Sequence, residues 1–328
     1  MRREIVVVED LYKYFNVVKA GKRRVLKAVD GVSFKLRRGE ILGLVGESGS
    51  GKTTVGRLVT RLLKPTRGRI LFDGIDIAEM PEKRLRPLRR RFQMVFQDPY
   101  ASLNPRMPIG KAIAEPLVVH GLAGWEEAKR RALELLEKVG LTPAEDFYNR
   151  LPSQLSGGQR QRAVIARAVI LEPDFIVADE PVSMVDVSMR ASILDLLVKL
   201  RRELGTAMLF ITHDLAVAKM ISDRIAVMYV GKIVEEAPSD ELVAHPMHPY
   251  TRALITSVPS IAWRNRRRFP IKGDIADPTS LPMGCRYHPR CPLARDKCRR
   301  EEPALAEARP GHLVACHYPV GEPLKPLR

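Results

Sequence analysis

The chain has 328 residues, and its 55 lysines and arginines against 38 aspartates and glutamates give a formal net charge of +17. This length allows two domains, and an apolar share of 45% excludes a disordered chain. The positive charge suggests an anionic partner, such as a nucleic acid or a membrane surface. No run of about 18 apolar residues occurs, so no membrane-spanning helix is expected.

Apolar strands alternate with amphipathic helices up to about residue 250. Strands are predicted at 40–45, 69–72, 175–178 and 207–211, and helices at 52–63, 125–140, 159–171 and 193–204. This alternation indicates an α/β fold with a mostly parallel sheet covered on both faces.

The composition changes after about Tyr250, where prolines become dense and aliphatic periodicity fades. Residues 1–284 contain no cysteine, and the later part has four, namely Cys285, Cys291, Cys298 and Cys316. A domain boundary is therefore predicted in the region 245–260.

A phosphate-binding loop is predicted from the strand at 40–45 to the following helix. Its residues fit the pattern G-x-x-x-x-G-K-[ST] and are Gly46, Glu47, Ser48, Gly49, Ser50, Gly51, Lys52 and Thr53. Glycines let several backbone N–H groups point inward at a phosphate, and the helix N-terminus adds a favourable partial charge. Lys52 is expected to reach the β- and γ-phosphates, and the Thr53 hydroxyl to bind Mg²⁺.

Three further residues follow apolar strands. Asp179 ends the strand at 175–178 and is suited to hold magnesium, while Glu180 is placed to act as general base on the attacking water. An Asp-Glu pair alone is more often a helix cap, but behind a phosphate loop the catalytic interpretation prevails. His213 closes the strand at 207–211 and is either a γ-phosphate contact or a structural histidine.

The pentapeptide Leu155-Ser156-Gly157-Gly158-Gln159 forms a second glycine turn before a helix. With it the chain resembles the ABC-transporter ATPase family over residues 1 to about 250. The resemblance implies that ATP is contacted by Phe15 (or neighbouring Tyr14), the loop Gly46–Thr53, Thr54, Gln97 and Asp179, and that contacts across a dimer come from Ser156, Gly157, Gly158, Gln159 and Asp186. It also implies that Mg²⁺ is held by Thr53, Gln97 and Asp179. Catalysis would depend on Glu180, His213 and Gln97.

The resemblance also implies the architecture. Residues 1–255 would form a P-loop NTPase domain of the ABC ATPase type, with a RecA-like core, an antiparallel β-subdomain and an α-helical subdomain. Residues 256–328 would form a small Cys-rich C-terminal domain. Two such ATPases would dimerise head to tail, and each ATP would lie between the phosphate loop of one chain and the glycine turn of the other.

Three segments are similar to the oligopeptide/dipeptide importer subfamily, namely 96–105, 180–183 and 248–254, and the residues after Gln97 most resemble its F-type subunit. Partners implied are a second ATPase, forming a heterodimer, two transmembrane permease subunits and an extracytoplasmic solute-binding protein, with the chain bound peripherally at the cytoplasmic face of the membrane. Oligosaccharides and metals remain alternative solutes. Met184-Val185 departs from the family pattern Ser-Ala-Leu-Asp before Asp186.

The four cysteines have the spacing C-x5-C-x6-C-x17-C. Disulfides are disfavoured in a reducing compartment, and zinc sites usually contain closer cysteine pairs than these. The similarity of residues 284–292 to the subfamily's tail implies a [4Fe–4S] cluster, with Zn²⁺ as the alternative and His288, His312 and His317 as substitute ligands.

The alternative function is that of a soluble nucleic-acid-associated ABC ATPase, suggested by the charge. Repair ATPases of this superfamily carry long coiled-coil arms with heptad repeats between the phosphate loop and the glycine turn, and its translation factors carry two ATPase domains in one chain. In this chain about 100 residues without sustained heptads separate Lys52 from Leu155, and only one phosphate loop is found. A stand-alone iron–sulfur protein would leave the ATPase motifs unexplained. Basic residues at 84–91 and at 264–268 suit an anionic membrane face, and no nucleic-acid partner is expected.

Overall fold

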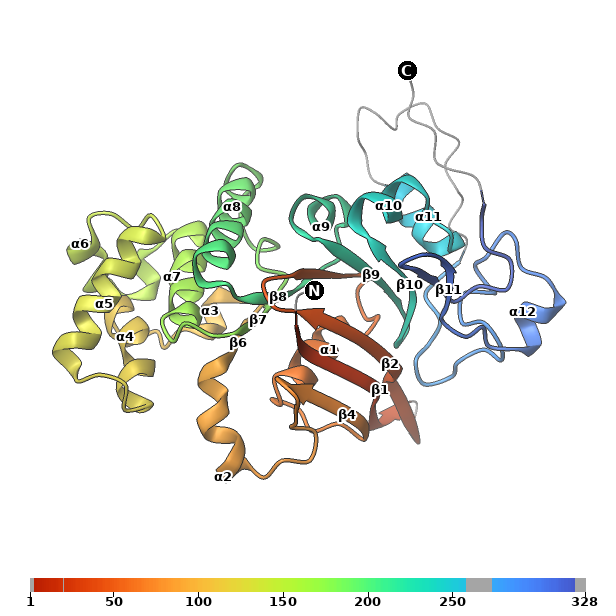
Figure 1. Cartoon of the computed structure of the whole chain (residues 1–328), viewed down its shortest axis with the longest axis horizontal. Helices are drawn as coiled ribbons and strands as arrows, with labels where there is room; N and C mark the ends of the chain where they lie inside the picture. Colours follow the sequence, from red (N-terminus) through yellow and green to blue (C-terminus); the bar gives the residue numbers. More distant parts are fainter. Residues whose placement is uncertain (1–2, 20, 258–272, 322–328) are drawn as a thin grey trace, which may run out of the picture. The chain divides into compact units, whose positions relative to one another are not determined.

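The computed structural model describes residues 3–19, 21–257 and 273–321, so the basic residues at 264–268 lie outside it. The chain forms two compact units, each assembled from segments distant in the sequence (Figure 1). The helical unit consists of Met1–Ile5, Leu36–Glu40 and Glu79–Leu209. The P-loop unit consists of Val6–Lys35, Ile41–Ala78 and Phe210–Arg328.

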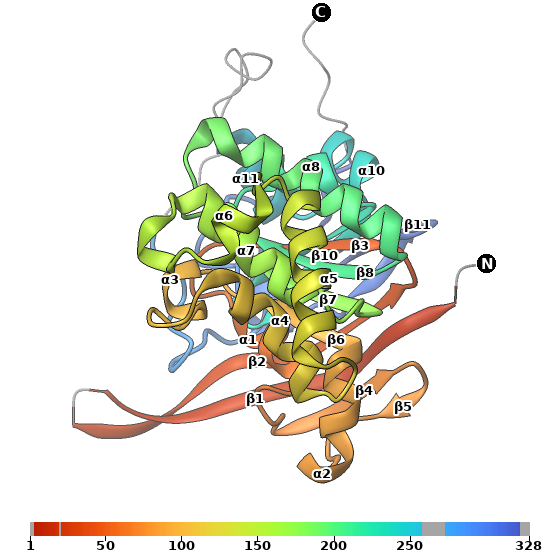
Figure 2. The ribbon, with the colours of Figure 1, turned by 90° about the vertical axis from the view of Figure 1, so that its left-hand side faces the viewer.

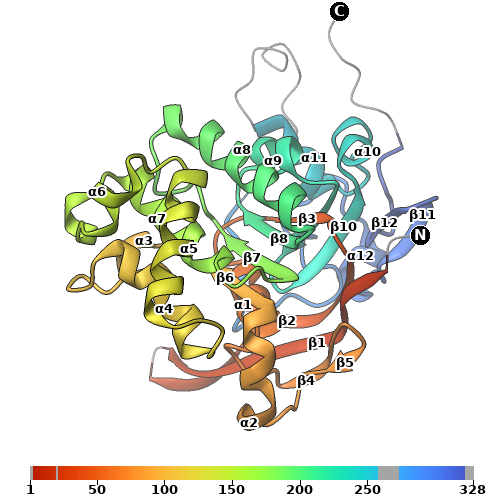
Figure 3. The same ribbon diagram turned by 60° about the vertical axis from the view of Figure 1, so that its left-hand side comes forward.

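The helical unit is dominated by helices that bury one apolar face each. Helices α4, α5 and α7 pack together (Figures 2 and 3). In α5 the buried residues Ala128, Ala132 and Leu136 recur every fourth position, as an amphipathic helix requires. The elements are α2 (Glu82–Leu85), η1 (Arg86–Arg91), β6 (Phe92–Val95), α3 (Pro99–Ser102), α4 (Ile109–Val119), α5 (Trp125–Lys138), α6 (Ala144–Tyr148), η2 (Pro152–Gln154), α7 (Gly157–Val169), β7 (Phe175–Asp179) and α8 (Val187–Leu204).

The P-loop unit contains an antiparallel sheet of order β2-β1-β4-β5 and a run of strands of order β11-β12-β10-β9-β3. Its elements are most of β1 (Glu4–Lys19) and β2 (Lys22–Arg37), β3 (Ile41–Val45), α1 (Lys52–Val59), β4 (Arg67–Phe72), β5 (Ile75–Asp76), α9 (Leu215–Ile221), β9 (Arg224–Tyr229), β10 (Lys232–Pro238), α10 (Ser239–Ala244), α11 (Pro249–Ser257), α12 (Asp296–Arg300), β11 (Ala306–Arg309) and β12 (His312–Val314). Strand β8 (Ala207–Thr212) is divided between the two units.

The predicted α/β fold is confirmed, and every predicted strand and helix is present. Parallel pairing occurs between β3 and β9 and between β6 and β7. Helix α1 ends at Val59, before the predicted end at residue 63, because Arg61 adopts a left-handed backbone conformation with φ 51°. Among the described residues, no helix combines the length and apolar character needed to cross a bilayer.

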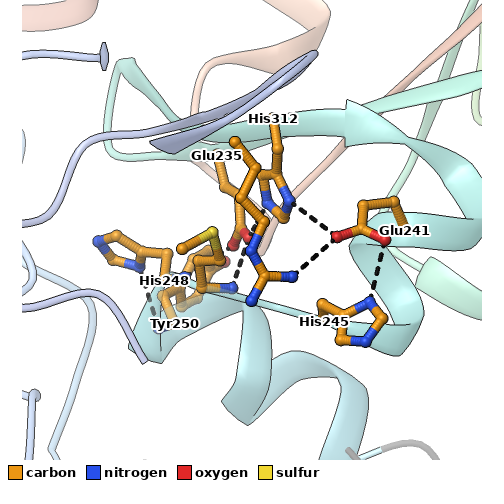
Figure 4. Close-up of polar contacts among 8 residues, drawn as sticks. Glu235, Glu241, His245, His248, Tyr250 and His312 are labelled. Carbon is orange, nitrogen blue, oxygen red and sulfur yellow. Dashed lines mark hydrogen bonds and ion pairs between the residues drawn. The ribbon is translucent and has the colours of Figure 1, made fainter. Parts of the chain in front are cut away.

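The C-terminal tail extends the run of strands of the P-loop unit. Strand β12 pairs antiparallel with β10, and β11 pairs with β12. Beneath this pairing His312 Nε2 lies 2.7 Å from Glu235 Oε1, and both side chains are fully buried (Figure 4). Glu235 also accepts hydrogen bonds from the backbone N–H groups of Met247 at 2.6 Å and His248 at 2.9 Å. The buried carboxylate therefore fixes both the tail strand and the start of α11.

Replacing His312 with alanine is expected to lower the free energy of unfolding by about 3 kcal/mol, because Glu235 would stay buried without one of its partners. Urea unfolding measured by circular dichroism tests this. Lys297→Ala removes an exposed ion pair of the same tail and should change stability little. Equal effects of the two changes would show that the buried contact contributes no more than an exposed one.

Candidate nucleotide-binding site

The loop after β3 has the tight curl that its glycines predict. A Cβ at Gly46 would lie 2.1 Å from the Met228 carbonyl oxygen, and one at Gly51 would lie 2.1 Å from that of Ala28. Gly51 also has φ 105°, which side chains rarely adopt. Any other residue at either position would therefore force the loop or the neighbouring backbone to move.

Lys52 and the start of α1 supply the positive groups of the loop. The Lys52 side chain is buried, and its Nζ donates to the carbonyl oxygens of Gly46 at 2.7 Å and Glu47 at 2.9 Å. No side chain caps the N-terminus of α1, which Gly51 precedes. Thr53 and Thr54 lie half-buried in its first turn. Backbone N–H groups, an ammonium and two hydroxyls at one helix start form a suitable cradle for phosphates.

Tyr14 and Phe15 are neighbours on β1, and only Tyr14 has a strong polar anchor. The Tyr14 hydroxyl donates a short hydrogen bond to Asp30, and burial together with this bond raises the pKa of Tyr14 to about 12. Burial alone would raise the pKa of Asp30, but hydrogen bonds from Tyr14 and Arg286 lower it. The Phe15 ring lies 5.1 Å from the Lys13 ammonium. Which of the two rings stacks on adenine stays a prediction.

The helical unit carries the acidic pair. Strand β7 ends at Asp179, whose side chain is 2% exposed. Glu180 follows with φ 46°, a left-handed conformation that is uncommon for a residue with a side chain. The Ser183 hydroxyl and backbone N–H both donate to the Glu180 carbonyl oxygen, at 2.9 Å and 3.1 Å. A strained backbone held by local hydrogen bonds is typical of functional positions.

The glycine turn at Ser156 starts α7 through a capping box. Ser156 Oγ accepts a hydrogen bond from Gln159 N at 3.3 Å, and Gln159 Oε1 accepts one from Ser156 N at 3.0 Å. A hydroxyl that accepts in this way can still donate its proton to a phosphate. A Cβ at Gly157 would lie 3.5 Å from the Met184 carbonyl oxygen. The segment Met184-Val185, which departs from the family pattern, therefore lies next to the glycine turn.

Two other predicted residues of the helical unit have exposed side chains. Gln97 lies just after β6, and Asp186 precedes α8 without capping it through its carboxylate. The helical unit thus holds Gln97, Ser156, Gly157, Gly158, Gln159, Asp179, Glu180 and Asp186. The P-loop unit holds Phe15, the loop Gly46–Thr53, Thr54, His213, which is exposed after β8, and the four cysteines.

The four cysteines line one cavity of about 10 Å³, enough for one water molecule. Burial raises the pKa of Cys285 to about 11 and that of Cys316 to about 12. Within the described part of the chain, no three His, Cys, Asp or Glu side chains are arranged to hold a metal ion.

Of the three histidines considered as substitute ligands, His288 and His317 line the cavity of the cysteines. His312 does not, because its Nε2 contacts Glu235. The suggestion of His312 as a nearby ligand is therefore wrong.

Sequence reasoning missed the contacts of Glu47. Its carboxylate binds Arg290, and its backbone N–H donates to the Tyr250 hydroxyl at 2.9 Å. The importer-like segments 248–254 and 284–292 contain Tyr250 and Arg290, but neither pattern indicated a contact with Glu47.

Comparison with known proteins defines the class. Residues 29–183 match the ABC transporter family, and residues 234–298 match the oligopeptide/dipeptide transporter C-terminal region. The dimeric ATP-binding cassette MJ0796 bound to ADP and Pi is similar in structure, with a TM-score of 0.65 and 32% identity, over 71% of this chain and 98% of that one. The fold and the motifs are those of an ABC-transporter ATPase.

The full-length relatives narrow the class. A putative peptide import ATP-binding protein of Brucella ovis is 50% identical over 95% of this chain and 97% of its own length. The oligopeptide transport ATP-binding protein AppF of Bacillus subtilis is 48% identical over the same shares. The chain belongs to the ATP-binding proteins of ABC transporters, in their oligopeptide/dipeptide group. The nucleic-acid alternative finds no support among these relatives.

Proposed function

We propose that this ATPase drives the import of oligopeptides or dipeptides. The observation that carries the proposal is the match of residues 234–298 to the C-terminal region of such transporters, since this segment lies beyond the general ABC match. Relatives of nearly equal length are named for peptide import. Oligosaccharides are the other solute class to be tested.

The proposed chemistry divides between the two units. Lys52, Thr53 and the backbone N–H groups of the phosphate loop bind the β- and γ-phosphates, because they gather a cation and donors at one helix start. In the helical unit, the buried carboxylate of Asp179 and the amide of Gln97 offer oxygen ligands of the kind that Mg²⁺ prefers, and in the P-loop unit the Thr53 hydroxyl offers another; the ion would neutralise phosphate charge when bound. Glu180 accepts a proton from the attacking water, and His213 contacts the γ-phosphate.

A head-to-tail dimer is proposed for turnover. Ser156, Gly157 and Gly158 would bind the nucleotide held by the partner ATPase, with Gln159 and Asp186 beside them. Two observations support this assignment. The Ser156 hydroxyl accepts a hydrogen bond but can still donate its proton, and the Asp186 carboxylate does not cap helix α8. We propose a heterodimer with a related ATPase.

The assembly would place the chain at the cytoplasmic face of a membrane, bound to two permease subunits that receive solute from a binding protein. Exposed arginines before Gln97, such as Arg84 and Arg86, would suit the anionic membrane face. Affinity purification of the tagged chain from native membranes should recover a permease pair and a second ATPase. After reconstitution, the binding protein loaded with a peptide should stimulate ATP hydrolysis, whereas stimulation by oligosaccharides alone would overturn the peptide assignment.

In the proposed domain organisation, residues 1–255 form the ATPase domain and residues 256–328 a Cys-rich C-terminal domain that holds a [4Fe–4S] cluster. Support comes from the four thiols around one cavity. A [4Fe–4S] cluster takes one cysteine thiolate on each of its four irons, which matches the number of cysteines that line this cavity. The cavity itself must widen to receive the cluster.

Protein purified without oxygen should be brown, should contain about four irons and four sulfides per chain, and should bleach with dithionite. Cys298→Ser should lower the iron content strongly, whereas Leu293→Ala, a change in the same cavity wall at a side chain that cannot bind iron, should leave it unchanged. A colourless protein with one zinc per chain would contradict the cluster.

A further inference from the structure

Two buried arginines of the C-terminal tail reach the elements that form the nucleotide site. Both lie between Cys285 and Cys291, and their exposed fractions are 7% for Arg286 and 5% for Arg290. Arg286 Nη2 binds the Asp30 carboxylate, which in turn holds the Tyr14 hydroxyl. All these residues belong to the P-loop unit.

Arg290 forms an ion pair with Glu47, a residue of the phosphate loop. Its two terminal nitrogens donate to the two carboxylate oxygens of Glu47, at 2.7 Å and 3.1 Å, in a bidentate pair. The guanidinium also lies 5.8 Å from the ring centroid of Tyr229 and 5.9 Å from that of Tyr287. Bidentate geometry and two aromatic neighbours fix the arginine fork in one orientation.

The side chain, the backbone N–H and the carbonyl oxygen of Glu47 are all hydrogen-bonded, and the partners of the first two come from residues after 245. Besides the Arg290 pair, its backbone N–H donates to the hydroxyl of Tyr250, a fully buried side chain in the core of the unit. Its carbonyl oxygen accepts hydrogen bonds from Lys52 Nζ at 2.9 Å and from the Ser50 backbone N–H at 3.2 Å. The position of Glu47 therefore helps to fix the position of the Lys52 ammonium in the absence of a nucleotide.

A loop held in its binding conformation does not lose that conformational freedom again when ATP binds. We propose that Arg290 is a positioning residue for ATP binding, which holds the phosphate loop through Glu47, so that the C-terminal tail completes the nucleotide site. This inference rests on the proposed binding of ATP to that loop. It gives the importer-type tail a role in the ATPase itself.

Arg290→Ala is expected to raise the Kd and the KM for ATP about tenfold while kcat changes little, a coupling within the usual range between two sites of one protein. Arg290→Lys keeps the charge but loses the fork, so its effect should be intermediate. In the Glu47→Gln background, Arg290→Ala should cost much less than it does alone, because the pair is already weakened. Equilibrium binding of a fluorescent ATP analogue and steady-state hydrolysis provide the readouts.

Arg309→Ala is the matched control, since Arg309 lies in the same tail and pairs with Glu241 outside the phosphate loop. It should leave Kd and KM unchanged. The inference is overturned if Arg290→Ala lowers the melting temperature without changing KM, or if the effects of the two pair mutations simply add. If the wild-type chain itself fails to bind ATP, the proposed function fails instead.

Discussion

Replacing Glu180 with glutamine is expected to lower kcat for ATP hydrolysis by about 10²- to 10⁴-fold while ATP binding is retained. The amide has the shape of the carboxylate but cannot accept a proton from water at neutral pH. Because neither residue is glycine, the strain of φ 46° is the same in both proteins. With hydrolysis blocked, ATP should hold the variant in a dimer with its partner ATPase, which size-exclusion chromatography with and without ATP detects.

Glu172 offers a matched control for this experiment. It is an exposed glutamate of the same helical unit and has a similar left-handed backbone, with φ 49°. Glu172→Gln should hydrolyse ATP at the normal rate and should not accumulate a dimer. Normal turnover by Glu180→Gln would refute the general-base role, and mixed subunits that stay monomeric with ATP would refute the dimer.

Gly46→Ala is expected to weaken ATP binding by about 100-fold, the effect of a displacement of about 1 Å in a positioned site. The new methyl group would lie 2.1 Å from the Met228 carbonyl oxygen, and this atom belongs to the backbone of the neighbouring strand β9. The loop must therefore move. The φ of Gly46 is outside the left-handed region, so the effect comes from the contact alone.

Binding of the fluorescent ATP analogue measures this change, and circular dichroism checks that the variant folds. Gly124→Ala is the control, because a Cβ there would meet no atom within 4 Å. It should leave ATP affinity intact. Equal affinities of Gly46→Ala and the wild-type chain would show that this loop is not the phosphate site.

The sequence predicted the parts of the fold that depend on local patterns. The apolar run before Gly46 and the helical period after it define β3 and α1 without any distant contact. The motifs likewise predicted the site residues one at a time. Strands β11 and β12 were not predicted, since both are short and their pairing depends on β10, far away in the chain.

Contacts between residues far apart in the chain could not be predicted either, because local sequence patterns do not determine which distant segments meet. Arg290 and Glu47 are separated by 243 positions, and no sequence pattern around either residue indicates that the two form a pair. The left-handed conformation of Glu180 is equally hidden, because a glutamate adopts it only where surrounding structure imposes it.

The pairing of β12 with β10 has a consequence for shortened chains. Without β12, β10 would become an edge strand, and its unpaired N–H and C=O groups could pair with a second molecule. Its residues Ile233 and Val234 are apolar, so such an edge would favour intermolecular sheet growth. A chain that ends before β12 would therefore need a redesigned β10, with further charges or a proline, to avoid aggregation.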